Sequence, residues 1–212
     1  PLLCTMNVPV ATELVKKTFG MDNQTLGRAA ASIPPGAHGL MLLPYFEGER
    51  VPNVPEGTGV WLGYNEATHT PAHFARAAME GPALGLAYGF NRMKKMGIEP
   101  KEIRLTGGGS KSPVWRQIMA NVFGIPVACT EEPEGAALGA AIQARWALER
   151  QNNPAACIAN LCDRYVKVDE STRCQPNADA ARLYAELLKV HEAMSIALRP
   201  VFRQHRDIVS EA

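Results

Sequence analysis

The stretch that decides the fold is residues 106–112, Thr-Gly-Gly-Gly-Ser-Lys-Ser, which lies between an apolar run at 103–105 and a helical pattern at 113–123. Because glycine has no side chain, the glycines at 107–109 allow positive φ angles and let a ligand approach the backbone closely. The following helix directs its free N–H groups and positive dipole end toward this loop. The pattern fits two interpretations equally well: a site for a phosphorylated ligand such as a nucleotide, or a tight turn without a ligand.

Two familiar phosphate-binding motifs do not fit this loop. A Rossmann fingerprint needs glycine at the sixth position of G-x-G-x-x-G, where this sequence has Ser112. A P-loop needs glycine directly before Lys-Ser/Thr, where this sequence has Ser110. A nucleotide bound at this loop would therefore occupy another type of site.

The segments around the loop alternate between strand and helix signals. Strands are predicted at 103–105 and 127–129, with a helix at 113–123 between them that Ser112 caps. A second helix is predicted from 135 to about 150, and its many alanines and glycines suit it to close packing. This order of strand, helix, strand and helix indicates an α/β fold.

Residues 1–96 are predicted to be mainly helical with a loop-rich interruption. Residues 1–32 have helical spacing, broken by turn signals. Short strands are predicted at 39–43 and 60–62, among many prolines and glycines. A long helix is predicted from 70 to 96, and Pro82 should kink or divide it because proline lacks a backbone N–H.

The end of the chain is predicted to be irregular from 151 to 178, followed by a helix from about Asp179 that Pro200 bends or ends. Apolar residues at spacings of four and three define the face expected to pack. These residues are Leu183, Leu187, Val190, Met194, Ala197 and Val201.

Composition excludes several classes of function. The 212 residues carry a net charge of +1, and no basic stripe indicates a nucleic-acid partner. No apolar run approaches the roughly 20 residues of a membrane span. Five cysteines without C-x-x-C spacing argue against a disulfide framework or a zinc ribbon, so we expect a cytoplasmic protein with reduced thiols. The beginning at Pro1 leads us to expect a segment from the middle of a longer enzyme.

Two other groups of polar residues are candidates for a functional site. His69 and His73 are four residues apart, but Pro71 between them favours a helix start over a metal site, so no metal ligands are predicted. Glu49 and Arg50 lie in a loop framed by glycine and proline, where Arg50 could contact a phosphate or a sugar hydroxyl. On spacing alone, a solvated loop with a local ion pair is the favoured interpretation.

Four segments together resemble the C-terminal half of FGGY-type carbohydrate kinases, and most closely xylulokinases. Residues 43–52 are similar to the xylulokinase "PY…GER.P" segment, and 59–80 to the second family signature. Residues 107–121 are similar to the adenosine motif, and 134–141 to the "ALGAA" helix. The resemblance covers about residues 1–150, and the order and spacing of the four segments make it specific. Tyr64 and Pro82 depart from the signature, where an aliphatic residue is usual at the first position.

The resemblance implies an actin-like ATPase fold of the ribonuclease-H type, with ATP and Mg²⁺ bound between two lobes. It places Gly107, Gly108 and Gly109 at the nucleotide, Ser112 beside the adenosine, and Arg50 with Glu49 along the cleft. The family's catalytic aspartate, which lies in a G-x-x-D segment, is expected upstream of this chain, together with an N-terminal lobe that binds the sugar. No catalytic residue is therefore assigned, and the chain alone is expected to be inactive.

The same resemblance divides the chain into three parts: a helical segment from the lobe junction at 1–40, the nucleotide-binding lobe at 41–150, and an irregular stretch plus a helix packed on that lobe at 151–212. The implied activity is ATP-dependent phosphorylation of a ketopentose, D-xylulose to D-xylulose 5-phosphate. Ribulose, gluconate or glycerol as substrate, a non-catalytic actin-like nucleotide-binding module, and a homodimer all stay open.

Overall fold

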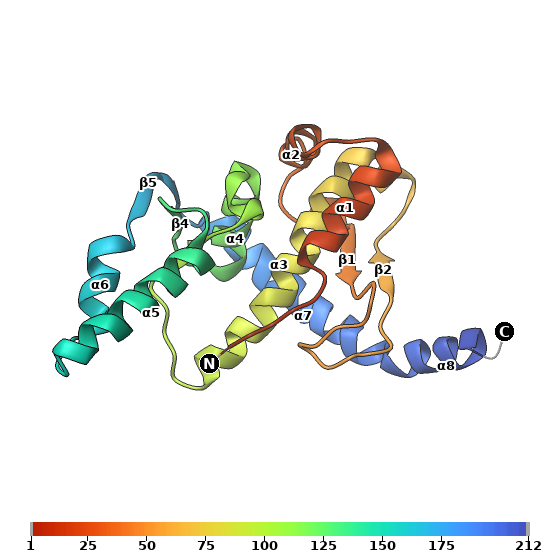
Figure 1. The fold of residues 1–212 in the computed structure, drawn as a ribbon. Coiled ribbons are helices and arrows are strands. Elements are labelled where there is room, and N and C mark those ends of the chain that lie inside the picture. Colours follow the sequence, from red (N-terminus) through yellow and green to blue (C-terminus); the bar gives the residue numbers. More distant parts are fainter. Residues whose placement is uncertain (1, 211–212) are drawn as a thin grey trace.

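A long helix, α3 (Pro71–Lys95), runs through the centre of the computed structural model, which describes residues 2–210 (Figure 1). Two helices and an antiparallel pair of strands pack on one side of α3. These elements are α1 (Val8–Phe19), α2 (Asn23–Ala31), β1 (Met41–Pro44) and β2 (Gly59–Leu62).

A three-stranded sheet lies beyond α3, with the strand order β3-β4-β5. Its strands are β3 (Ile103–Leu105), β4 (Val127–Thr130) and β5 (Val168–Cys174). Strands β3 and β4 are parallel, whereas β5 runs antiparallel to β4. The helices of this half are α4 (Pro113–Phe123), α5 (Gly135–Asn152) and α6 (Ile158–Tyr165). Helix α7 (Ala178–Ala197) packs on α3, α4 and β1, and α8 (Arg199–Ser210) continues on the β1 side, where Phe202 packs with Leu43 and Tyr45. The predicted α/β alternation is therefore confirmed.

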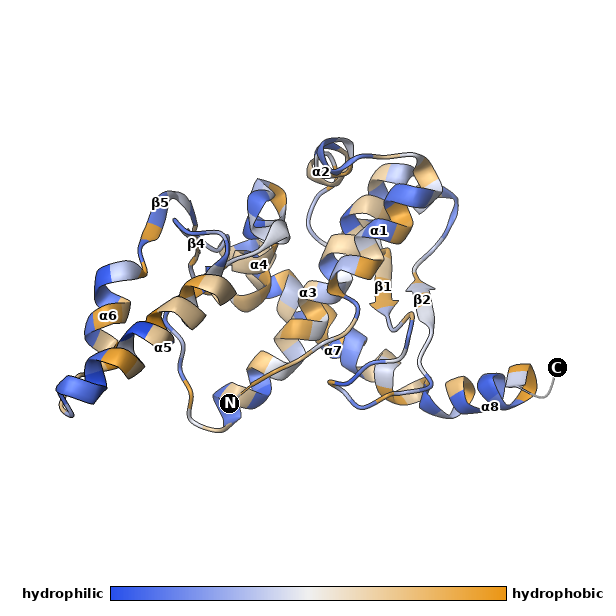
Figure 2. Cartoon of the chain, in the orientation of Figure 1, coloured by the Kyte–Doolittle hydropathy of each residue, from blue (hydrophilic) through white to orange (hydrophobic). Residues whose placement is uncertain are grey.

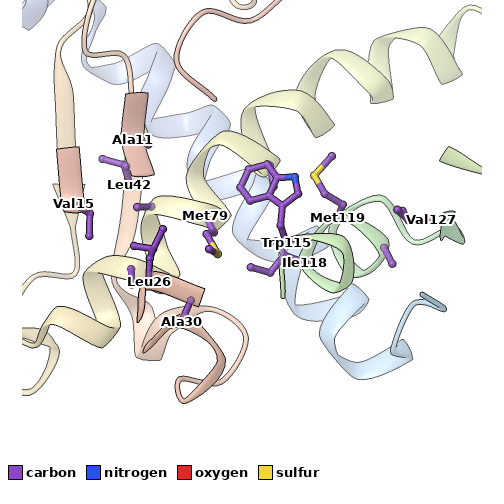
Figure 3. Close-up of a cluster of buried hydrophobic side chains, with 14 residues drawn as sticks. Ala11, Val15, Leu26, Ala30, Leu42, Met79, Trp115, Ile118, Met119 and Val127 are labelled. Carbon is purple, nitrogen blue, oxygen red and sulfur yellow. The ribbon is translucent and has the colours of Figure 1, made fainter. Parts of the chain in front are cut away.

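The largest buried cluster connects the two sides of the molecule (Figure 3). Leu26 of α2 and Leu42 of β1 belong to the same cluster as Met79 of α3 and Trp115 of α4. Because burial of each large apolar side chain contributes roughly 1.5–3 kcal/mol, this shared core holds α4, and the loop before it, against α1–α3. Within residues 2–210, no helix is both long enough and apolar enough to cross a membrane.

Local signals placed several helix ends correctly. Helix α4 occupies the predicted range, and the Ser112 hydroxyl accepts a hydrogen bond from the Trp115 N–H at 3.3 Å. Gly124 ends the helix with a left-handed φ of 68°. Pro82 does not divide α3, which continues over 25 residues. One missing N–H is tolerated there because Pro82 is buried in the packed middle of the helix.

The prediction of an irregular stretch at 151–178 is wrong. It contains helix α6 and strand β5, and β5 completes the central sheet. The sequence of β5 is polar and lacks alternation, so its stability comes from pairing with β4. The backbone N–H of Cys129 also donates a hydrogen bond to the Thr172 hydroxyl at 2.8 Å.

The predicted packing face of α7 is also wrong, and the small residues that suit α5 to close packing are exposed. Only Ile142 is buried in α5, although parts of its ribbon carry the colour of apolar residues (Figure 2). On α7, Leu183 and Val190 of the predicted face are 41% and 43% exposed. The buried residues of α7 are instead Ala180, Tyr184, Leu188, His191 and Ser195.

Polar contacts explain why α7 buries this face. The Tyr45 hydroxyl donates a hydrogen bond to Ser195 Oγ at 3.0 Å, and Tyr184 reaches the charged residues of α3. Hydrogen-bonded polar groups can decide which face of a helix is buried, even against the apolar spacing. Leaving such groups unpaired costs more free energy than exposing a few aliphatic side chains.

His191, a buried residue of α7, should make the folding stability depend on pH. The imidazole is 1% exposed, its Nε2 has no hydrogen-bond partner, and burial lowers its pKa to about 4. Below pH 6.5 the unfolded imidazole binds a proton that the folded one does not, so stability falls with pH until the folded pKa is reached. The loss between pH 7 and 4 should be on the order of 3 kcal/mol.

Urea unfolding of the wild type and of His191→Leu at a series of pH values would measure this loss. The variant should lose less stability between pH 7 and 4 than the wild type. His205→Asn, at an exposed histidine of α8, is the control and should keep the wild-type slope. Parallel pH profiles for wild type and His191→Leu would contradict the assignment.

Candidate functional site

The glycine loop opens onto a large cavity of about 1010 Å³. The loop and the start of α4 form one wall, while α1 and α2 form the opposite wall and α3 contributes to the floor. The loop side is lined by Leu105, Thr106, Gly108, Gly109, Ser110, Lys111, Ser112, Pro113, Val114, Trp115 and Met119. The other lining residues are Val8, Pro9, Thr12, Glu13, Asn23, Gln24, Gly27, Arg28, Ala31, Met79 and Leu86.

The loop presents bare backbone to this cavity. Gly107 has a φ of 83°, which glycine adopts without strain, and a short 3-10 turn follows from Gly108 to Lys111. Gly108 and Gly109 are exposed, and among residues 2–210 no acceptor pairs with their N–H groups. Two unpaired amides beside an open cavity can donate hydrogen bonds to an anionic ligand such as a phosphate.

Hydrogen bonds with α4, β4 and the segment before α5 fix the shape of the loop. The Ser110 carbonyl accepts a hydrogen bond from Arg116 Nη1 at 2.8 Å and from the Cys129 thiol at 3.5 Å. The Gly107 N–H donates to the Pro133 carbonyl at 3.2 Å, and the Thr106 hydroxyl donates to the same oxygen. The amides are therefore held in place before any ligand arrives, which reduces the entropy lost on binding.

The structure brings together only some of the predicted site residues. Gly108, Gly109 and Ser112 line the cavity, whereas Gly107 supports the turn without lining it. The Ser112 hydroxyl accepts a hydrogen bond from the Trp115 N–H, so it has one lone pair left for a ligand. Lys111 also lines this wall and adds a positive charge.

The opposite wall was missed by sequence reasoning. Glu13 of α1 and Gln24 and Arg28 of α2 line it, about eighty residues before the glycine loop. Arg28 and Lys111 place cationic side chains on both walls, which suits an anionic ligand. No local pattern marks these helices as part of a site, because they are ordinary amphipathic helices until packing on α3 brings them to the loop.

Glu49 and Arg50 do not line this cavity. Glu49 is 5% exposed, and its Oε1 accepts hydrogen bonds from the backbone N–H groups of Met6 and Arg50 at 3.1 and 2.7 Å. The carboxylate also lies 3.4 Å from Asn7 Nδ2, so it joins the N-terminal segment to the 45–57 loop. Arg50 is exposed. That these two residues line a cleft stays a prediction.

Asp22 acts as a helix cap and is not a candidate catalytic base. Asp22 lies in a short Gly-Met-Asp segment, but its Oδ1 accepts the Thr25 N–H at 2.7 Å as the N-cap of α2. That hydrogen bond lowers its pKa, so the carboxylate is a poor proton acceptor. Residues 2–210 also hold no group of three or more His, Cys, Asp or Glu side chains placed to bind one metal ion.

Fold and site together define the C-terminal lobe of an actin-like ATPase fold, as found in sugar kinases of known structure. Residues 11–148 match the profile of the FGGY family of carbohydrate kinases, C-terminal domain. The chain belongs to the FGGY family of carbohydrate kinases.

Several relatives support this assignment. The chain is 36% identical to the xylulose kinase of Haemophilus influenzae over 184 residues, which is 87% of this chain and 36% of that protein. It is 25% identical to a crystal structure of ligand-bound xylulose kinase from Lactobacillus acidophilus, with a TM-score of 0.84 over 95% of this chain and 40% of that one. A gluconate kinase from the same organism gives a TM-score of 0.83 at 25% identity, over 95% of this chain and 40% of that one. The chain thus spans well under half the length of these relatives.

Proposed function

We propose that this chain is the nucleotide-holding half of an ATP-dependent carbohydrate kinase that converts D-xylulose to D-xylulose 5-phosphate. The observation that carries the nucleotide assignment is the pair of unpaired amides at Gly108 and Gly109 beside the large cavity. A triphosphate fits there because both walls carry cationic side chains and, among the described residues, no atom lies within 4 Å of the Cβ position of Gly108.

In this proposal the chain positions the nucleotide and leaves the sugar to an N-terminal lobe. Kinase chemistry depends mainly on positioning and on neutralising charge, with Mg²⁺ bridging phosphates that the protein holds in place. Gly108 and Gly109 would hold phosphate oxygens, Ser112 would lie beside the nucleoside, and Lys111 would offset negative charge. We assign neither a Mg²⁺ ligand nor the base to residues 2–210, and place the base, an aspartate, in the sugar-binding lobe.

The choice of D-xylulose rests on the "GER.P" loop at 48–52 and on the xylulose kinases among the relatives. Gluconate is the second candidate substrate, because a gluconate kinase has the same fold at nearly the same TM-score. Glu49 of that loop accepts hydrogen bonds from backbone N–H groups within the lobe, so we place the contacts that select the sugar mainly in the N-terminal lobe.

The decisive experiment uses the product of the complete reading frame that contains this sequence. With ATP and Mg²⁺ it should phosphorylate D-xylulose with a higher kcat/KM than D-ribulose, gluconate or glycerol. A preference for gluconate would change the proposed substrate, and the proposed kinase activity would still hold. Absence of phosphorylation with every sugar, together with retained ADP binding, would favour a non-catalytic nucleotide-binding module.

A further inference from the structure

Two histidines from distant segments meet where α3 begins. His38 lies in the turn before β1, and His73 lies in the first turn of α3. His38 Nδ1 is 2.9 Å from His73 Nε2, and the two rings are tilted by 47°. His69, which the spacing had paired with His73, contacts Tyr64 instead.

The backbone of the turn is arranged around His38. Ala37 and His38 have φ angles of 45° and 50°, in the left-handed region that side chains other than glycine rarely adopt. Gly36 holds the turn in place, because its N–H donates a hydrogen bond to Glu80 Oε1 at 3.0 Å. Ala37 is fully buried, so the turn is anchored while His38 reaches the surface.

The His73 ring has the orientation of a metal ligand. Its Nδ1 is 2.7 Å from the Thr70 hydroxyl, and an Nδ1–H donated to that oxygen leaves a lone pair on Nε2, which faces His38. His73 is 7% exposed, and burial, together with the nearby His38, lowers its pKa. The neutral imidazole is the form that binds metal ions.

We propose that His38 and His73 form a two-imidazole site for a first-row transition-metal dication of tetragonal preference, Cu²⁺ or Ni²⁺. Imidazole nitrogens suit both ions, and Cu²⁺ has the highest affinity among the divalent ions of the first row. The two nitrogens share a hydrogen bond of 2.9 Å, so they are already close enough to bind one ion together. Water completes the coordination shell, because the described residues offer no third His, Cys, Asp or Glu ligand.

Binding requires a small change in one ring only. The proton between the two nitrogens moves from Nδ1 to Nε2 of His38, so both facing nitrogens offer lone pairs and neither ring gains charge. His38 is exposed, and its ring can rotate until both lone pairs meet at the ion. The ion then joins the turn at 36–39 to α3. Neither histidine lines the cavity of the glycine loop, so the site is separate from the nucleotide site.

Titration of the chain with NiCl₂, followed by calorimetry and by the melting temperature, tests the site. The wild type should bind one Ni²⁺ with a dissociation constant that His38→Asn raises about tenfold or more. Asparagine is the suitable replacement because it tolerates a left-handed φ and leaves the turn folded. Ni²⁺ should raise the melting temperature of the wild type and not that of the variant.

His69→Asn is the matched control, because His69 is an exposed histidine next to the same helix start and does not contact His38. It should bind Ni²⁺ as the wild type does. The exposed thiols Cys4 and Cys157 are present in all variants, so binding to them cannot produce a difference. With Cu²⁺, electron paramagnetic resonance should show two nitrogen ligands in the wild type and one in either His38→Asn or His73→Asn.

Equal Ni²⁺ affinity in the wild type and His38→Asn would overturn the proposal. The proposal would also be overturned if neither Ni²⁺ nor Cu²⁺ changed the melting temperature or the resonance spectrum of the wild type and of His69→Asn. Neither readout depends on kinase activity, so this proposal can fail while the proposed function holds.

Discussion

Replacing Gly108 with valine is expected to weaken ADP binding by about tenfold or more, or by about 1.4 kcal/mol or more, while the domain stays folded. A Cβ added at Gly108 meets no atom within 4 Å, and its φ is not in the left-handed region, so the substitution causes neither a clash nor backbone strain. The valine side chain instead extends into the space where a phosphate would approach the amides. Calorimetric titration with ADP, in the product of the complete reading frame, gives the affinity.

Gly139→Val is the matched control. Gly139 also has nothing within 4 Å of its Cβ position, but it lies on α5 and away from the cavity. The control should bind ADP like the wild type, and both variants should retain the wild-type melting temperature within a few degrees. An unchanged ADP affinity in Gly108→Val would show that the nucleotide binds elsewhere.

Removing the carboxylate of Glu80 is expected to cost about 3–5 kcal/mol of folding free energy. Glu80 is 3% exposed, and its Oε1 accepts hydrogen bonds from Arg76 Nε and the Tyr184 hydroxyl, both at 2.5 Å. Arg76 Nη2 also donates to the Tyr184 hydroxyl at 2.8 Å, which joins α3 to α7. Glu80→Ala leaves the buried guanidinium of Arg76 without its counter-charge, and that unpaired charge accounts for the loss.

The chain contains its own control for this prediction. Arg145 and Glu149 have the same spacing of four residues on a helix and lie 2.7 Å apart, but the Arg145 side chain is 62% exposed. Glu149→Ala should therefore cost only about 0.3–0.5 kcal/mol. Urea unfolding of both variants measures the difference. Similar losses in Glu80→Ala and Glu149→Ala would mean that the buried pair contributes little.

Sequence reasoning succeeded where hydrogen bonds are local. Ser112 caps α4 and Gly124 ends it because each acts on backbone groups within about four residues. The same local chemistry predicted the glycine turn before α4 and the break between α1 and α2. The four family-like segments all lie within the matched range, residues 11–148, and the predicted family and fold are confirmed.

Sequence reasoning failed where a segment depends on a distant partner. Strand β5 is too polar to be recognised, and pairing with β4 is what makes it a strand. The packing face of α7 was misplaced because Tyr184 and Ser195 are buried through hydrogen bonds to other elements. The hydrogen bond from the Met6 N–H to the buried Glu49 carboxylate also joins distant segments, and no local pattern predicts it.

By itself, the sequence determined the α/β order, the ends of α4, the glycine bend and membership of the sugar kinases, since each is encoded in short segments and their order along the chain. Only the tertiary structure decided that α1 and α2 form the second wall of the cavity and that His38 meets His73. These features depend on how helices pack over α3, and packing depends on side-chain contacts between segments that no short window of sequence contains.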